Sequence, residues 1–295
     1  MTRRCMVLGA TGQVGSALLF VLRQHGVEPI GTGFTRGGDL TLDLGDADAV
    51  RSALESAQPD LVLVVGAYTH VDGCETAPEQ SRRVNFEGPA AAAGWASAHG
   101  ARVVFYSTDY VFDGQAGPYA EEDPVHPLSR YGLDKRAAEE AVLALGDRGT
   151  VLRTAWVYSW EDPPRNFMQR LALNVAAGQS ATIPDDQWGN PTFAGDLARA
   201  TWDLLERGAA GVVHTAGEQA MTRYAFARLI AESFGLPAHR ITGVPTAALG
   251  QTAPRPLRAG MKVDRLRSLI GWVPRPPAAV LAELAAQHPL NVRDP

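Results

Sequence analysis

Short apolar runs alternate with amphipathic segments along the first half of the chain. The segments between the apolar runs repeat their hydrophobic positions with the spacing of a helix. The pattern predicts strands at 5–9, 29–33, 61–65, 103–107 and 150–153, and helices at 13–25, 47–56, 79–99 and 131–145. Strands that are apolar throughout are typical of a parallel sheet covered on both faces. We therefore expect an α/β fold with a doubly wound, Rossmann-type parallel sheet.

Shorter elements, separated by prolines, follow Trp156. The pattern predicts helices at 167–177, 194–206, 223–234 and 279–286, and a strand at 212–215 that returns to the sheet. Residues 1–155, with a return segment at about 193–216, are expected to form the sheet domain. Residues 156–192 and 217–295 are expected to form a smaller, interwoven C-terminal lobe.

Composition and charge narrow the function classes. Of the 295 residues, 45% are hydrophobic and 20% charged, and the net charge of −5 argues against a nucleic-acid binder. No apolar run approaches the roughly 18 residues that cross a bilayer, and a strand predicted from residue 5 leaves no room for a signal peptide. The two cysteines, Cys5 and Cys74, form neither a disulfide framework nor a metal-binding pattern. We expect a cytoplasmic protein with no metal site.

A glycine-rich loop joins the first predicted strand to the first predicted helix. Its sequence is Gly9-Ala-Thr-Gly12-Gln-Val-Gly15. Glycines at such a junction let backbone N–H groups approach a pyrophosphate at the positive end of the helix. The alternative is a tight turn that only packs the helix closely on the sheet. The position of the loop favours dinucleotide binding, by Gly9, Thr11, Gly12, Gln13, Val14 and Gly15.

The end of the second predicted strand bears on cofactor preference. An NAD site usually places an acidic residue there, about 20 residues after the loop, to bind the ribose hydroxyls. Residues 31–36 read GTGFTR, with no acid before Asp39. Arg36 is suited to the 2′-phosphate of NADP, although it also fits a solvated loop. The sequence favours NADPH and leaves NADH open, with Asp43 and Leu44 expected near the adenine.

A tyrosine and a lysine four residues apart are the strongest sign of chemistry. Only two of the 27 basic residues are lysines, and one of them, Lys135, follows Tyr131 by one helical turn. A nearby cation favours the phenolate, which lowers the tyrosine pKa toward the range of a general acid or base. Thr108 ends a predicted strand, at the sheet edge where open α/β sheets bind ligands. Its hydroxyl is placed to polarise a carbonyl oxygen, or else it caps its own turn.

These motifs resemble the dTDP-4-dehydrorhamnose reductase family of extended short-chain dehydrogenases/reductases. The likeness runs from about residue 4 to residue 272 and includes the glycine loop, 107–114 (STDYVFDG), 131–135 (YGLDK), 153–158 (RTAWVY) and 186–192 (DQWGNPT). The resemblance implies hydride transfer from NADPH to C4 of a nucleotide-linked 4-keto-6-deoxy sugar. The expected reaction converts dTDP-4-dehydro-L-rhamnose to dTDP-L-rhamnose.

The resemblance also implies roles for individual residues. Thr108, Tyr131 and Lys135 would form the catalytic triad, with Tyr131 and Lys135 also contacting the cofactor. Ala67, Tyr68 and Thr69 would line the nicotinamide side, with Asn85 as a structural and catalytic helper. Sugar-side contacts would come from Asp109, Tyr110, Val111, Phe112 and Trp156.

Two positions separate this chain from related patterns. Dehydratases of the superfamily carry an Asp-Glu pair after the threonine, whereas this chain has Asp109-Tyr110, so simple carbonyl reduction is favoured. The family often has an acidic residue just after the glycine loop, used in a metal-linked dimer, but here Ser16-Ala17 follows, which argues against a magnesium-bridged dimer. A homodimer of another kind stays open. Arg255, Arg258 and Lys262 either meet the sugar diphosphate or form a solvated basic face.

Two rival hypotheses remain. Residues 33–36 and 214–224 are similar to the regulatory β subunit of methionine adenosyltransferase, which shares this fold. On that interpretation the protein binds NADP and a partner enzyme without turning over a sugar. The other rival is a reductase of a different dTDP-linked 4-keto-6-deoxy sugar.

Overall fold

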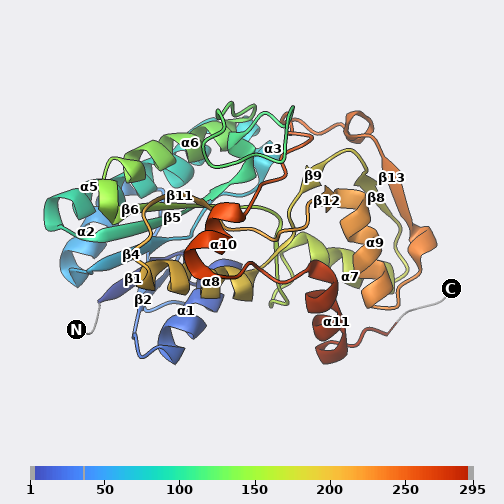
Figure 1. Cartoon of the computed structure of the whole chain (residues 1–295), viewed down its shortest axis with the longest axis horizontal. Coiled ribbons are helices and arrows are strands. Elements are labelled where there is room, and N and C mark those ends of the chain that lie inside the picture. The colour runs from blue at the N-terminus through green and yellow to red at the C-terminus, as the bar shows by residue number, and fades with distance from the viewer. Residues whose placement is uncertain (1–3, 36, 292–295) are drawn as a thin grey trace.

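A seven-stranded parallel sheet forms the centre of the molecule. The computed structural model describes residues 4–35 and 37–291, and Figure 1 shows the sheet at the left. The strand order is β11-β6-β5-β4-β1-β2-β3, and every pairing within it is parallel. The strands are β1 (Cys5–Leu8), β2 (Ile30–Gly33), β3 (Leu40–Thr41), β4 (Leu61–Val64), β5 (Arg102–Thr108), β6 (Gly149–Thr154) and β11 (Gly211–His214).

Helices cover both faces of this sheet. Successive residues of one strand face opposite sides, so Val7 of β1 belongs to one buried cluster and Met6 to another. The cluster around Val7 is completed by α1 (Gln13–Gln24), α8 (Ala194–Glu206) and α10 (Asp264–Ile270). The cluster around Met6 is completed by α2 (Ala47–Ala57), α5 (Gly88–His99) and α6 (Arg130–Leu143). The doubly wound fold is therefore confirmed.

The segment expected to be one helix at 79–99 is divided. It contains α4 (Pro78–Arg82), a π-helical turn at Arg83–Glu87 and then α5, and α3 (Val71–Thr76) precedes it. Pro78 stands at the start of α4, where a missing backbone N–H is tolerated. Periodicity alone did not reveal α3, because six residues are too few for a helical pattern to be distinct.

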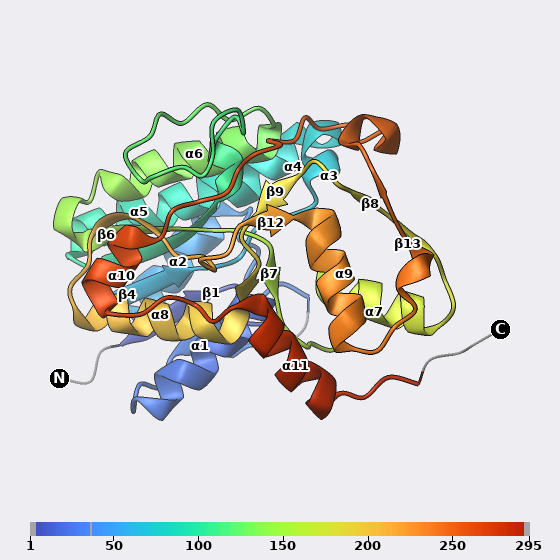
Figure 2. The same ribbon diagram turned by 45° about the vertical axis from the view of Figure 1, so that its right-hand side comes forward.

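The C-terminal lobe has its own core. It contains α7 (Phe167–Ala176), α9 (Arg223–Ser233) and α11 (Pro277–Gln287), which share one buried cluster. Figure 2 shows these helices on the lobe side of the molecule, and the lobe also contains three two-stranded ladders. The ladders pair β7 (Val157–Tyr158) with β10 (Thr192–Phe193), β9 (Trp188–Gly189) with β12 (Met221–Thr222), and β8 (Ala181–Pro184) with β13 (Ile241–Val244).

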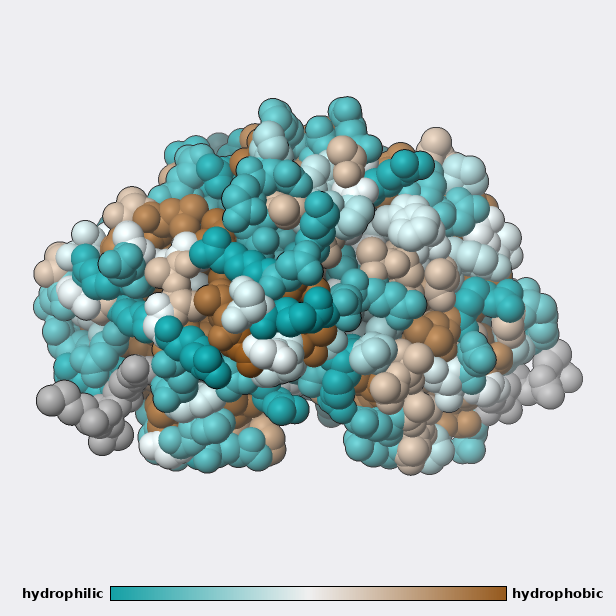
Figure 3. Space-filling view, viewed as in Figure 1, coloured by the Kyte–Doolittle hydropathy of each residue, from teal (hydrophilic) through white to brown (hydrophobic). Residues whose placement is uncertain are grey.

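The chain crosses between the sheet and the C-terminal lobe more often than the sequence predicted. The strand expected at 212–215 is present as β11 and returns to the sheet, where it pairs with β6. In addition, α10 packs against the sheet side of the molecule, through Leu266 and Ile270, although residues 217–295 were assigned to the lobe. Figure 3 shows mainly hydrophilic side chains on one face, with an indentation at its lower edge between the two parts. Among the described residues, no helix has the length and apolar character needed to cross a membrane.

Candidate active site

The glycine loop lies in close contact with the sheet. Gly9 has φ +93°, and a Cβ there would lie 2.5 Å from the Cα of Gly66. A Cβ on Gly15 would lie 2.3 Å from the carbonyl oxygen of Gly9. Only glycine fits at these two positions, because a side chain at either one would clash with backbone atoms that cannot move away. The loop holds the start of α1 directly over the end of β1.

The first turn of α1 is free to meet an anion. Gly12 is its N-cap and supplies no side-chain hydrogen bond, and the first turn contains no acidic residue. Its backbone N–H groups therefore stand at the positive end of the helix without an intrahelical acceptor. A Cβ on Gly12 would meet nothing closer than 3.5 Å, so the loop's outer side is open. This geometry fits the pyrophosphate of a dinucleotide.

Gln13 points toward the C-terminal lobe. When the Gln13 amide is oriented so that both its oxygen and its nitrogen form hydrogen bonds, the oxygen accepts from the backbone N of Ser159 at 2.7 Å and from the Ser159 hydroxyl at 3.0 Å. The side-chain nitrogen donates to the carbonyl of Val157 at 3.3 Å. Gln13 thus links the loop to the lobe.

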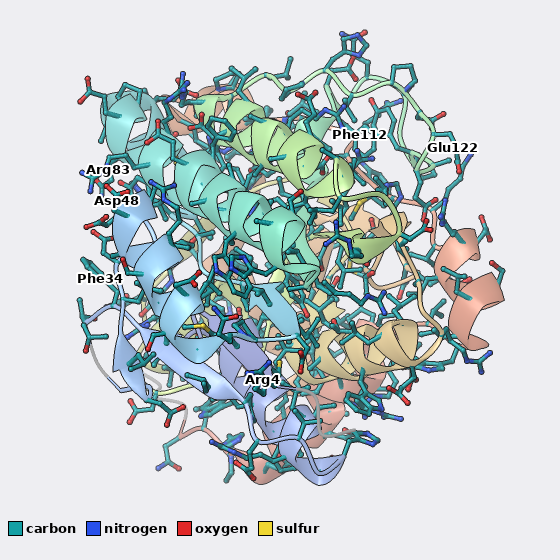
Figure 4. All side chains as sticks on the ribbon, turned by 90° about the vertical axis from the view of Figure 1, so that its left-hand side faces the viewer. Arg4, Phe34, Asp48, Arg83, Phe112 and Glu122 are labelled. Atoms are coloured by element: carbon teal, nitrogen blue, oxygen red, sulfur yellow. The ribbon has the colours of Figure 1, made fainter. Side chains whose placement is uncertain are left out.

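The turn after the second strand contains one carboxylate, that of Asp39, and the backbone nearby already binds it. The Thr32 hydroxyl accepts a hydrogen bond from the backbone N of Gly9 at 3.1 Å, and Asp39 accepts one from the backbone N of Gly31 at 2.7 Å. Asp39 therefore stabilises the turn. Arg36, expected to meet a 2′-phosphate, lies outside the described residues. Its neighbour Phe34 is 62% exposed, and Figure 4 shows it at the edge of the molecule that also carries Arg83.

Asp43 and Leu44 lie in the loop after β3. The Asp43 carboxylate accepts a hydrogen bond from the backbone N of Gly45 at 2.8 Å, and Arg83 donates to the carbonyl of Gly45 at 2.9 Å. Leu44 is buried, and its side chain lies 3.1 Å from the position of a Cβ on Gly66. The loop that holds both residues is thus fixed next to the glycine loop.

Asn85 forms hydrogen bonds with the backbone of the segment that follows β4. Its side-chain oxygen accepts a hydrogen bond from the backbone N of Tyr68 at 2.9 Å, and its nitrogen donates to the Tyr68 carbonyl at 3.0 Å. Asn85 has no exposed surface, so its side chain is not presented to a ligand. It fixes the backbone between Ala67 and Thr69 at the carboxyl edge of the sheet.

Thr108, Asp109 and Tyr131 come together at the end of β5. The Thr108 hydroxyl donates to the Asp109 carboxylate at 3.0 Å and accepts from the backbone N of Tyr110 at 3.2 Å. The ring of Tyr131, from the first turn of α6, meets Tyr110 edge-on with centroids 5.7 Å apart. All three side chains are buried, with 3–8% of their surface exposed. The Tyr131 hydroxyl also bonds to the Thr108 side chain, so the threonine and the tyrosine singled out in the sequence lie together.

The pKa of Tyr131 differs from the sequence expectation. Burial raises it, the Asp109 charge raises it further, and a hydrogen bond with Thr108 opposes both. The Lys135 ammonium donates instead to the Tyr106 carbonyl and lies 4.0 Å from the centroid of the Phe105 ring. Burial lowers the pKa of Lys135 to about 7. The expected lowering of the tyrosine pKa is thus wrong for this structure, because burial dominates the shift and the Lys135 ammonium is bonded to the Tyr106 carbonyl.

Val111 and Phe112 belong to the core. Neither has exposed surface, and Phe112 stacks on Tyr119 with centroids 4.2 Å apart. Figure 4 shows Phe112 at the opposite side of the molecule from Arg83. The side chains of both residues are thus closed to a sugar, and only their backbone remains for such a contact.

Trp156 stands between the sheet and the lobe with an unusual backbone. Its φ is +45°, a conformation that a bulky residue rarely adopts. A Cβ on Gly189 would lie 2.5 Å from the indole. The glycine at this position in the 186–192 motif therefore leaves space for the ring. Arg223 covers the indole, with its guanidinium carbon 3.9 Å from the ring centroid.

The basic residues singled out at 255–262 are not equivalent. Arg255 is paired with Asp72 at 3.1 Å, whereas Arg258 and Lys262 are exposed. Sequence reasoning overlooked Arg223, whose charge acts on Asp109 and, together with that of Arg255, on Tyr110. The available signal was a cation directly after Thr222, the residue that caps α9. Among the described residues, no group of three metal-ligating side chains gathers.

A parallel doubly wound sheet, a glycine loop at its carboxyl edge and a buried threonine–tyrosine pair define an extended short-chain dehydrogenase/reductase fold. The family described as RmlD substrate binding domain matches residues 3–288, and the chain belongs to this family.

Individual relatives span nearly the whole chain. A dTDP-4-dehydrorhamnose reductase of Streptomyces griseus is 36% identical over 260 residues, covering 86% of this chain and 83% of that protein. The methionine adenosyltransferase 2 subunit beta of Danio rerio is 31% identical over 276 residues, covering 90% and 85%. The fold is shared with a dTDP-4-dehydrorhamnose reductase of Bacillus anthracis solved in complex with NADP. That comparison gives a TM-score of 0.88 and 24% identity, and covers 97% of this chain and all of the other.

Proposed function

We propose that the protein uses NADPH to reduce the C4 ketone of a dTDP-linked 4-keto-6-deoxy sugar. The preferred substrate is dTDP-4-dehydro-L-rhamnose, and the product is dTDP-L-rhamnose. The observation that carries the proposal is the buried pairing of Thr108 and Tyr131 at the sheet edge that also bears the glycine loop. The Streptomyces griseus relative, which bears the reductase name, supports the same reaction.

We assign the dinucleotide to the loop from Gly9 to Gly15. The two crowded glycines and the uncapped start of α1 support this assignment. Tyr68, held by Asn85, and its neighbours Ala67 and Thr69 are assigned to the nicotinamide side. When bound, NADPH supplies the hydride that the ketone carbon accepts, and NADH is the competing cofactor to be tested beside it.

Tyr131 is assigned as the proton donor. Reduction of a ketone requires a proton at the developing alkoxide oxygen, and burial keeps the phenol in its protonated form at neutral pH. The Thr108 hydroxyl is assigned to hold the same oxygen. Lys135 lies one turn along α6 and is assigned to the ribose side of the cofactor and to the stabilisation of the tyrosinate that remains.

The residue at position 110 supports reduction over elimination. A dehydratase needs a carboxylate base there, whereas Tyr110 has its pKa raised by burial and by the Asp109 charge. A neutral phenol is a poor base at neutral pH. We therefore assign Asp109 and Tyr110 to the hydroxyl groups of the sugar, together with Trp156.

One rival function rests on a specific observation. The likeness to a methionine adenosyltransferase subunit covers 90% of the chain. On that alternative the protein would bind NADP and a methionine adenosyltransferase, and its buried threonine–tyrosine pair would perform no turnover.

The test is the oxidation of NADPH, with NADH in parallel, when purified protein meets dTDP-4-dehydro-L-rhamnose. We expect rapid oxidation and dTDP-L-rhamnose as the product. Absence of turnover while NADPH still binds would reject this substrate. Co-purification of a methionine adenosyltransferase from the source cells would then favour the regulatory function.

A further inference from the structure

The guanidinium of Arg223 stacks on two aromatic rings. It is the first residue of α9, and its guanidinium carbon lies 3.9 Å from the centroid of the Trp156 ring and 4.7 Å from that of Phe167. Stacking on aromatic faces leaves the N–H groups at the rim of the guanidinium available for a ligand.

The charge of Arg223 has no anionic partner among the described residues. Its guanidinium forms neither a side-chain hydrogen bond nor an ion pair there, and Asp109 and Tyr110 act on it only through space. Burial lowers the pKa of Arg223 to about 10. The start of a helix is also the unfavourable end for a cation. An anion bound beside Arg223 would relieve each of these costs.

The other arginine near the site is already engaged. Arg255 is paired with Asp72 at 3.1 Å and donates to the carbonyl of Ala253 at 3.0 Å. Its side chain is 8% exposed, so it has little surface left for a ligand. Arg223 is therefore the cation best placed to serve a ligand that extends from Asp109 and Trp156.

We propose that Arg223 binds the diphosphate of the nucleotide sugar. A planar guanidinium matches the spacing of phosphate oxygens and can donate two parallel hydrogen bonds to them. The inference rests on the proposed function, since it names the residue that would hold the substrate's charged linker. It also reassigns this role from Arg258, which is exposed.

The test compares dTDP with thymidine, which lacks the diphosphate, by calorimetry on the full-length protein. Arg223→Met keeps an unbranched side chain on the rings but removes the charge. We expect it to weaken dTDP binding about 10- to 100-fold, as for loss of a charge-assisted hydrogen bond. Thymidine binding and NADPH binding should stay within about 2-fold, because neither ligand places a phosphate at Arg223.

Arg228→Met is the matched control. Arg228 lies on the same helix, exposed, and bonds to the hydroxyl of Tyr224 at 3.3 Å. Its loss should leave both affinities unchanged. Arg223→Lys should restore part of the dTDP affinity, because the charge returns without the planar fork.

Three results would overturn the inference. They are unchanged dTDP affinity in Arg223→Met, equal weakening of dTDP and thymidine, and absence of dTDP binding by the wild-type protein. Failure of the proposed function is a separate result. Arg223-dependent binding of dTDP without any reduction of the keto sugar would support the diphosphate site and reject reduction of this sugar.

Discussion

At the scale of single residues, desolvation controls the charge of the site. Burial is the largest cause of every shift there: it raises the pKa values of Tyr131 and Asp109 and lowers those of Lys135 and Arg223. Each change favours the neutral form of the side chain. A protonated phenol suits a reductase, because the tyrosine must give up a proton as the ketone oxygen becomes an alkoxide.

Asp109 offers a direct test of this desolvation. Burial raises its pKa to about 7, while the Thr108 hydrogen bond and the Arg223 charge lower it. The pKa of an aspartate in an unfolded chain is about 4. Between these pH values the native carboxyl retains its proton while the unfolded chain loses it. The native state therefore loses stability as the pH rises from about 4 to about 7.

Asp109→Asn removes this ionisation and keeps the shape of the side chain. We expect the melting temperature of the variant, relative to wild type, to rise by at least about 2 °C between pH 4 and pH 8. The exposed Asp147→Asn serves as the control and should show no such trend. A relative melting temperature of Asp109→Asn that is flat across this range would mean that Asp109 is well solvated.

At the scale of elements, the chemistry that we propose depends on the placement of α6 and of the glycine loop. The helix that carries Tyr131 is tied to β6 by Arg153, which bonds to both carboxylate oxygens of Glu139 at 2.9 and 2.8 Å. Both side chains are almost completely buried. Such a bidentate pair orients α6 on β6, and loss of Glu139 would leave the buried Arg153 charge without its partner.

The glycine loop predicts a contrast between two alanine substitutions. Gly15→Ala would place a methyl group 2.3 Å from the Gly9 carbonyl oxygen, which must shift the loop. We expect a loss of about 1–3 kcal/mol in the free energy of unfolding and at least about 10-fold weaker NADPH binding. Chemical denaturation and a fluorescence titration would measure both quantities.

Gly94→Ala is the matched control. Gly94 lies within α5 and is exposed, and a Cβ there meets nothing within 4 Å. This change should stabilise the protein by about 0.5–1 kcal/mol and leave NADPH binding unaltered. Equal NADPH affinity in Gly15→Ala and wild type would contradict the assignment of the loop to the dinucleotide.

At the scale of the whole molecule, two separately packed parts meet at the site. The lobe is joined to the sheet side by Gln13 with Ser159, and by Asp72, which accepts a hydrogen bond from the backbone N of Ala253 and pairs with Arg255. Trp156 packs against the cores of both parts and lies between them. A change in the relative position of the parts would therefore alter the surroundings of Trp156, where we propose that the sugar binds, more than the glycine loop.

The sequence predicted the sheet, its covering helices and the threonine–tyrosine pair. These features follow from local periodicity and from the rule that strand ends meet at one edge. It missed α3, the packing of α10 on the sheet and the position of Arg223 over the Trp156 ring. Arg255 forms an ion pair with Asp72, whereas Arg223 forms none among the described residues. This difference depends on which segments meet in the folded chain, and a local sequence pattern does not contain that information.

The most direct test of the account is the Tyr131→Phe variant, assayed for both turnover and NADPH affinity. We predict that kcat for the dTDP-linked keto sugar falls at least about 100-fold, because the proton donor is lost. The dissociation constant for NADPH should change by less than about 3-fold, since the ring and its edge contact with Tyr110 remain. Turnover that is unchanged in Tyr131→Phe would contradict the central claim that this phenol protonates the substrate.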